Sequence, residues 1–310
     1  MKNIEFMEKI IDPLSDLGFK LLFGREKISE PVLKDLLNAL LCGSEGFEEI
    51  TSVKYLNNER SAEWKDSKSI RYDILCQTES KHRFIVEMQK ASQPKFIDRA
   101  TFYVARGIAE QGYRGKKDSE REWDYELEPV IGVFICNSYV RGLEKKPIVR
   151  ASTLDEDSFK PIGMKTRYVF VQLPAFKKTE DECENLDDQW IYNIKNMGIR
   201  QEVAFRHNSE VFKRLAEVAN VATLTPEQRY HYEADVKIVR DTLNQIRGAY
   251  QDGEENGEKR GLEKGRAEGE QIERRKSIRM MLSFGIRPEQ IAKEYGISVT
   301  EVAHIAESDL

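Results

Sequence analysis

The sequence predicts an α/β fold in which a mixed central sheet is flanked by helices and followed by a helical region. Three observations predict it. Over the first 175 residues, segments with the period of a helix alternate with segments that have the composition of strands. The run PVIGVFIC at 129–136 is apolar enough to be a fully buried strand. After residue 174 the pattern becomes helical and strongly charged.

The individual elements follow from local patterns. Two helices are expected within 13–42, where leucines recur at helical spacing and Gly24 can end the first helix. The segment 94–112 has the pattern of a longer helix that ends at Gly112. Strands are expected at 50–56, 69–77, 83–89, 129–136 and 166–173.

Four segments are expected along the chain. They are a core over 1–175, a helical extension over 176–250, a glycine-repeat charged linker or helix over 251–275, and a small helical module over 276–310. In the third segment, glycine occupies every fourth position from Gly253 to Gly269, among Glu, Lys and Arg. Because each glycine inside a helix costs about 1 kcal/mol relative to alanine, a charged linker is favoured over a helix with a glycine stripe.

The last segment has the spacing of a helix-turn-helix module. Pro288 is expected to start one helix, Gly296 to end it, and Ser298 to cap the next. Between 286 and 310, however, two Lys or Arg accompany five Asp or Glu, and the expected reading helix has no Lys or Arg. Phosphate contacts supply much of the affinity of DNA-reading helices, so a protein contact or a cap is favoured over DNA reading.

Composition excludes several classes of protein. The chain has 310 residues, with 49 Lys and Arg against 54 Asp and Glu, and its net charge of −5 argues against a coat of basic residues for nucleic acid. No apolar run is long enough to span a membrane, and the first ten residues lack the apolar region of a signal peptide. We therefore expect a cytoplasmic protein. The dispersed cysteines and histidines disfavour a His/Cys metal site, so catalysis would use carboxylates.

The most informative stretch is the expected hairpin SIRYDILCQTESKHRFIVEMQ at 69–89. A turn centred on Ser80 places Asp73 directly opposite Glu87, and alternation along the first strand places Tyr72 and Ile74 on the face away from Asp73. Two facing carboxylates repel each other unless a cation lies between them. Hard oxygen ligands of this kind suit Mg²⁺ or Mn²⁺.

A second interpretation of the hairpin stays open at this point. Its acidic face could simply meet solvent, or it could pair with Arg71 and Arg83 on the same two strands. The pattern of carboxylates alone favours this structural interpretation over a metal site.

The residues also resemble a known family. The chain is similar to the recombination-promoting nuclease or putative transposase family of bacteria, which belongs to the PD-(D/E)xK nuclease superfamily. The matching stretches cover most of the first 175 residues and the helical remainder more loosely. They are DPLSDLGFKLLFG at 12–24, RYDIL at 71–75, IVEMQKASQPKFIDRATFYVARGIAEQG at 85–112, WDYELEPVIGVFI at 123–135 and the glycine-repeat tail.

The resemblance implies a restriction-endonuclease-like core over 1–175 that cleaves DNA with the help of a divalent metal. Asp73 and Glu87 would hold the metal, Mg²⁺ or Mn²⁺, which would make water nucleophilic near neutral pH. The third position of the motif falls on Gln89, where Lys is usual; its amide can orient water but supplies no positive charge. Lys20 or Lys68 would then supply that charge.

Three further residues are candidates for the same site, Asp16 from the resemblance and Arg99 and Tyr103 from their place on the polar stripe of the helix that follows the second strand. Asp16 maps to the N-terminal motif and would be a further acidic ligand, although Asp16 and Lys20 also stand at i and i+4 and can pair on the helix surface. Arg99 and Tyr103 would contact phosphate or brace the carboxylates. A polar stripe that only meets solvent is the equally weighted alternative for them.

The function expected from the resemblance is a metal-dependent DNA endonuclease linked to recombination or mobile DNA. The alternative is a catalytically weak nuclease-fold protein that acts by binding DNA or protein, with self-association through the helical C-terminal region. Local charge agrees with DNA as a partner, because residues 60–125 carry 14 Lys or Arg against 11 Asp or Glu. The pattern does not distinguish DNA from RNA as the physiological substrate.

Overall fold

A computed structural model describes residues 9–44, 48–57, 59–60, 70–118, 126–163 and 165–307. The chain divides into two compact units, Met1–Val239 and Arg240–Leu310. All the described candidate site residues lie in the first unit.

The first unit is built on a mixed six-stranded sheet with the strand order β1-β4-β5-β6-β8-β7. The central strands β5, β6 and β8 run parallel, whereas β1, β4 and β7 each join their neighbour in antiparallel pairs. Strands β2 and β3 form a separate two-stranded sheet. The strands are β1 (Val53–Tyr55), β2 (Glu59–Arg60), β3 (Ile70–Arg71), β4 (Ile74–Thr78), β5 (Arg83–Gln89), β6 (Val130–Cys136), β7 (Ile148–Ser152) and β8 (Thr166–Gln172).

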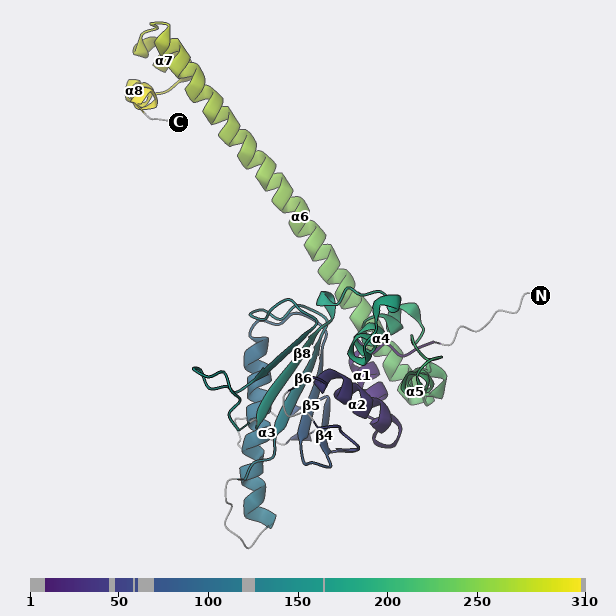
Figure 1. Ribbon diagram of the computed structural model, residues 1–310. Helices are drawn as coiled ribbons and strands as arrows, with labels where there is room; N and C mark the ends of the chain where they lie inside the picture. The colour runs from purple at the N-terminus through teal and green to yellow at the C-terminus, as the bar shows by residue number, and fades with distance from the viewer. Residues whose placement is uncertain are drawn as a thin grey trace, which may run out of the picture. The chain divides into compact units, whose positions relative to one another are not determined.

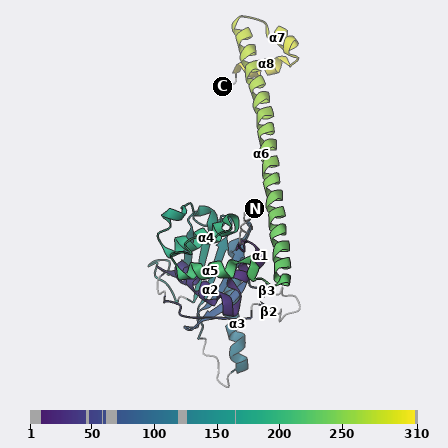
Figure 2. The same ribbon diagram turned by 90° about the vertical axis from the view of Figure 1, so that its right-hand side faces the viewer.

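Helices cover both faces of the sheet (Figure 1). Four helices share one core with the first face: α1 (Asp16–Phe23), α2 (Glu26–Leu41), α4 (Leu186–Arg200) and α5 (Glu210–Ala219). Figure 2 looks onto this helical layer. The other face is covered by α3 (Phe96–Asp118). Short 3₁₀ turns lie at η1 (Leu173–Ala175), η2 (Glu180–Glu182) and η3 (Val221–Thr223). The predicted mixed sheet flanked by helices is therefore confirmed.

Helix α3 lies very close to β6, because Gly132 has no side chain. A Cβ atom at Gly132 would lie 2.9 Å from a methyl group of Val104 and 2.5 Å from the ring of Phe134. Every residue of β6 is buried, as the apolar run predicts. This close packing fixes α3 against the sheet and with it the residues that α3 presents near the end of β5.

The predicted strand at 69–77 is interrupted. The structure has β3 at Ile70–Arg71 and β4 at Ile74–Thr78, with Tyr72 and Asp73 in neither strand. The break has a local cause: at Asp73, side-chain hydrogen bonds to the neighbouring strand replace the backbone ladder. The prediction that Tyr72 shares a face with Ile74 is therefore wrong. Tyr72 packs with Leu75 in the core on the α3 side, whereas Ile74 packs on the opposite side.

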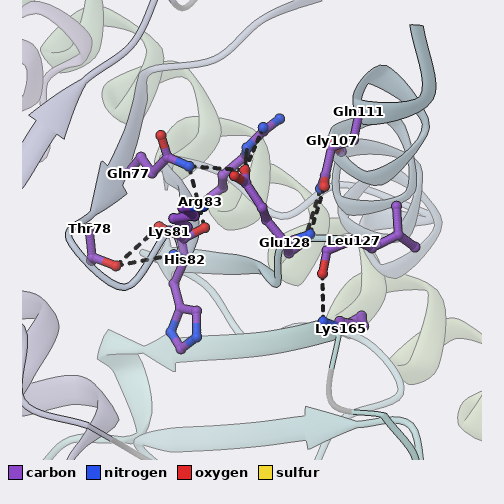
Figure 3. Close-up of polar contacts among 10 residues, drawn as sticks. All are labelled: Gln77, Thr78, Lys81, His82, Arg83, Gly107, Gln111, Leu127, Glu128 and Lys165. Atoms are coloured by element: carbon purple, nitrogen blue, oxygen red, sulfur yellow. Dashed lines mark hydrogen bonds and ion pairs between the residues drawn. The ribbon is translucent and has the colours of Figure 1, made fainter. Parts of the chain in front are cut away.

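Polar contacts fasten the start of β5 to the segment that leads into β6 (Figure 3). The carboxylate of Glu128 accepts hydrogen bonds from Arg83 Nε at 2.7 Å and from Gln77 Nε2 at 2.9 Å. The side chain of Gln111 on α3 binds both the N–H and the C=O of Glu128, at 2.7 and 2.9 Å. These contacts lie at the opposite end of β5 from Glu87.

Three helices complete the chain: α6 (Pro226–Ser283), α7 (Pro288–Tyr295) and α8 (Val299–Glu307). The glycine-repeat tract lies inside α6 and is helical rather than a linker. Ion pairs one turn apart, Lys264–Glu268 at 3.8 Å and Arg266–Glu270 at 2.9 Å, offset part of the cost of its glycines. Among the described helices, none combines the length and the apolar composition that crossing a membrane requires.

The end of the second unit has a small core of its own. Ile278 of α6, Ile291 and Ala292 of α7 and Val302 of α8 are buried together. Pro288 begins α7, Gly296 ends it in the left-handed conformation, and the hydroxyl of Ser298 accepts a hydrogen bond from the N–H of Glu301 at 3.1 Å. The three helix boundaries predicted from the sequence, at Pro288, Gly296 and Ser298, are therefore confirmed.

Candidate active site

Asp73 and Glu87 lie side by side at the edge where β4 begins and β5 ends. Register sets this arrangement: Ile74 pairs with Val86, so the preceding residue, Asp73, faces Glu87. The N–H of Asp73 donates to Glu87 Oε1 at 3.1 Å, and the N–H of Met88 donates to Asp73 Oδ2 at 3.0 Å. Thus the turn centred on Ser80 correctly predicts the position of one carboxylate against the other.

Lys20 joins helix α1 to this carboxylate pair. Its ammonium group lies 3.1 Å from Asp73 Oδ1 and 2.9 Å from Asp16 Oδ2. Burial alone would lower the pKa of Lys20, but the hydrogen bond to Asp16 and the charge of Asp73 outweigh it and raise the pKa. Lys20 is therefore a stable cation between two carboxylates that lie on different elements of the fold.

Glu87 carries a strongly perturbed carboxyl group. It is only 7% exposed. Burial, followed by the charge of Asp73, raises the pKa of Glu87 to about 8, although a backbone hydrogen bond from Asp73 and the charges of Arg99 and Lys20 act in the opposite direction. A buried carboxyl group beside a second carboxyl group is unfavourable as an anion, so a further cation would stabilise the pair.

The raised pKa of Glu87 predicts a pH dependence of stability in metal-free protein. The folded state binds the proton of Glu87 more tightly than the unfolded state does, so this stabilisation is complete below pH 4.5 and is lost as the pH rises through about 8. We expect the free energy of unfolding to fall by about 4 kcal/mol between pH 5 and pH 9 through this group.

Urea titrations in EDTA at pH 5, 7 and 9 measure this effect. Glu87→Gln keeps the shape of the side chain and cannot titrate, so the difference between its profile and that of the wild type isolates Glu87. Parallel profiles for the two proteins would contradict the prediction.

Gln89, the last residue of β5, and Lys90, which follows it, have different partners. The side-chain amide of Gln89 donates to the carbonyl of Ala91 at 2.7 Å. Lys90 forms an ion pair with Asp235 at 3.5 Å. The ammonium of Lys90 is thus held by a carboxylate of α6.

Arg99 and Tyr103 of α3 approach the carboxylate pair from the face of the sheet opposite to α1 and Lys20. The guanidinium of Arg99 lies 3.8 Å from Glu87 Oε2 and donates to the hydroxyl of Tyr103 at 3.0 Å. It also lies 5.0 Å from the centre of the Tyr103 ring. Burial, followed by the charge of Glu87, raises the pKa of Tyr103. Tyr103 also packs edge-on against Tyr72, with ring centres 5.4 Å apart.

The remaining candidates fall in different places. Asp16 contacts the ammonium of Lys20, which also contacts Asp73. Lys68 lies outside the described residues. Arg83, the alternative partner for the acidic face, is bound to Glu128 at the other end of β5, at distances of 2.5 and 2.7 Å.

The carboxylates of Asp73 and Glu87 are two protein ligands of the kind that a hard divalent cation prefers. Within the part of the chain that the structure describes, no three or more His, Cys, Asp or Glu residues are grouped as a metal site. Asp73 and Glu87 nevertheless supply carboxylate oxygens from adjacent positions, and the pKa of Glu87 stays raised despite the nearby charges of Lys20 and Arg99. Mg²⁺ commonly binds through one or two carboxylates and keeps several waters, which this pair would allow.

Asp235 and Tyr232 form contacts near the site that the sequence patterns do not predict. Both lie in the first turns of α6. The hydroxyl of Tyr232 accepts the N–H of Asp12 at 2.7 Å, and the carboxylate of Asp235 accepts the N–H of Leu17 at 3.1 Å. The partners are separated by 220 and 218 residues, so no local pattern could have predicted these contacts.

Comparison with known proteins gives one match. A family model described as "PD-(D/E)XK nuclease family transposase" matches residues 13–249. This range includes the whole described site, from Asp16 on α1 to Asp235 on α6. No curated protein and no solved structure matches the chain significantly.

Proposed function

The chain belongs to the PD-(D/E)XK nuclease transposase family, and on that premise we propose that it is a metal-dependent DNA endonuclease that acts in recombination or the movement of DNA. The observation that carries this proposal is the adjacency of Asp73 and Glu87, with the backbone N–H of Asp73 3.1 Å from the Glu87 carboxylate. Family membership supports a nuclease related to mobile DNA. The divalent metal, the endonucleolytic reaction and DNA as the substrate are parts of the proposal.

In this proposal each residue has a defined task. Asp73 and Glu87 would hold Mg²⁺ or Mn²⁺, which when bound would neutralise charge on the scissile phosphate and make water nucleophilic near neutral pH. Gln89 would orient the attacking water through its amide, after giving up its hydrogen bond to Ala91. Lys20 would supply the positive charge that a lysine at position 89 usually provides.

Arg99 and Tyr103 would support the site from α3. The guanidinium of Arg99 lies near Glu87 and is 39% exposed, so it can brace the carboxylate and still reach a phosphate oxygen. Tyr103 holds that guanidinium through its hydroxyl and its ring. Asp16 would keep Lys20 directed toward Asp73, or would become a further ligand if Lys20 moved away.

Plasmid cleavage tests the proposed function. Supercoiled plasmid incubated with the full chain and Mg²⁺ or Mn²⁺ is expected to be nicked or linearised, and EDTA is expected to stop the reaction. Asp73→Ala and Glu87→Ala are expected to lower the rate by about a thousandfold or more, because each removes a ligand group that acts in the transition state. The variant Glu144→Ala, at a solvent-exposed carboxylate that forms an ion pair with Lys146, serves as a control for loss of a negative charge.

Two results of this experiment would contradict the proposal. Cleavage that persists in both Asp73→Ala and Glu87→Ala would exclude these residues as the site. Absence of cleavage by the wild type with every metal tested would exclude the reaction itself.

A catalytically weak protein that binds DNA or protein is the second candidate. The favouring observation is Gln89, which has no charge and whose amide is already bound to Ala91. This candidate also includes self-association through the helical C-terminal region, where α6 presents the exposed side chains of Ile246, Tyr250 and Ile272. DNA binding without cleavage, or a dimer that persists in the nuclease-inactive variants, would favour it.

A further inference from the structure

We propose that Asp235 is a positioning residue of the candidate active site, and that the first turns of α6 therefore belong to the catalytic scaffold. The inference rests on the proposed function. It concerns a residue 146 positions beyond the last residue of the hairpin and outside the strands and helices that carry the nuclease motif.

The first contact of Asp235 is with helix α1. Its Oδ2 atom accepts the N–H of Leu17 at 3.1 Å. Leu17 lies in the first turn of α1, where backbone N–H groups have no partner within the helix and a negative charge is favourable. Asp235 thus acts as a cap supplied by a distant helix. Leu17 directly follows Asp16, and Lys20 lies one turn further along α1.

The second contact of Asp235 is with the end of β5. Its Oδ1 atom lies 3.5 Å from the ammonium of Lys90, and both side chains are partly buried, with 21% and 34% of their surface exposed. Lys90 directly follows Gln89. One carboxylate therefore holds the chain neighbour of Asp16 with one oxygen and the chain neighbour of Gln89 with the other.

The two contacts join the halves of the candidate site. Asp73 and Glu87 belong to the hairpin of the sheet, whereas Asp16 and Lys20 belong to α1, and the Lys20 bridge links the two groups directly. That bridge is partly buried, with 30% of the Lys20 side chain and 13% of the Asp73 side chain exposed, and it fixes α1 at one point only through Lys20. Asp235 adds a second tie. Tyr232, only 7% exposed, anchors the same part of α6 through its bond to Asp12.

A positioning role differs from a purely structural one in its effect on kinetics. The hydrogen bonds that tie Asp73 to Glu87 and to Met88 do not involve Asp235, so we expect the site for the metal to stay assembled when Asp235 is changed. What is lost is the placement of Lys20 and Gln89 relative to that pair. The turnover rate should therefore fall while metal affinity and the Michaelis constant for DNA stay near the wild-type values.

The test compares Asp235→Asn, Lys90→Gln, the double variant and the wild type in the full chain. Cleavage of a labelled DNA duplex is followed with Mg²⁺, Mn²⁺ binding is measured by calorimetry, and melting temperatures are recorded. Glu233→Gln is the matched control, because Glu233 is an exposed neighbour on α6 that forms an ion pair with Arg229, at 3.3 Å.

We expect kcat to fall about tenfold in Asp235→Asn and in Lys90→Gln, with the Michaelis constant and the Mn²⁺ affinity within twofold of the wild type. The double variant should be no slower than the slower single variant, because both remove the same ion pair. Glu233→Gln should cleave at the wild-type rate.

The outcomes separate this inference from the proposed function. A wild type that cleaves no DNA would contradict the proposed function. Wild-type cleavage that is unchanged in Asp235→Asn would overturn only the role of Asp235. Loss of Mn²⁺ affinity in parallel with a large drop in melting temperature would also overturn it, because Asp235 would then merely support the fold.

Discussion

Lys20→Gln is expected to have opposite effects on metal binding and on cleavage. The ammonium of Lys20 lies 3.1 Å from Asp73 Oδ1, where it occupies one side of a carboxylate that a divalent cation would share. Removing the competing charge should tighten Mn²⁺ binding about tenfold. Removing the positive charge beside the scissile phosphate should slow cleavage about a hundredfold. Calorimetry and single-turnover cleavage measure the two effects separately.

Lys20→Arg is the matched control for this prediction. It keeps the charge near Asp16 and Asp73 and should keep metal affinity near that of the wild type, with a smaller loss of rate from altered geometry. If Lys20→Gln binds Mn²⁺ less tightly than the wild type, Lys20 stabilises the metal-binding arrangement rather than competing with it. If Lys20→Gln cleaves at the wild-type rate, another cation supplies the charge.

Trp190→Ala is expected to cause the largest loss of stability. Trp190 of α4 is fully buried, with its ring centre 6.0 Å from that of Phe23 on α1 and 5.0 Å from that of Phe212 on α5. Its indole N–H donates to Asp35 Oδ1 at 2.6 Å. Loss of a buried tryptophan typically costs about 3 to 5 kcal/mol, a large part of the total stability of an ordinary domain.

Urea denaturation of the full chain measures this loss through the midpoint and slope of unfolding of the first unit. Trp190→Phe keeps the aromatic packing and should lose only about 1 to 2 kcal/mol, from the hydrogen bond to Asp35 and the reduced contact area. Leu186→Ala, at an exposed position of the same helix, should have little effect. Equal losses for Trp190→Ala and Leu186→Ala would show that α4 contributes little to the core it lies in.

The parts of the fold that the sequence predicts are those with a strong local signal. The apolar run at 129–136 predicts the buried strand β6, and a short turn between two apolar strands predicts the register of Asp73 against Glu87. Strand β7 was not expected, because Ile148–Ser152 lies at the sheet edge with a mixed pattern of burial. The break at Asp73 was missed because it depends on side-chain hydrogen bonds across the hairpin.

The candidate site is likewise predictable only where the signal is local. The facing carboxylates follow from strand alternation, whereas the bridge from Lys20 to Asp73 depends on how α1 packs against the sheet. The sequence offered two partners for Lys20, Asp16 on its own helix and the distant site, and the structure shows that it contacts both. Asp235 carried no signal at all, because an isolated aspartate on a charged helix is indistinguishable from its neighbours.

The long separation between α1 and α6 also sets an order of events during synthesis. Asp235 is synthesised 218 residues after its partner Leu17. At ordinary rates of translation this delay is about 10 to 40 s. Until then α1, with Lys20, lacks the cap that ties it to the rest of the site. A chain interrupted before α6 would therefore lack part of the scaffold for cleavage, so that the cell does not encounter a fully assembled nuclease before most of the protein has been made.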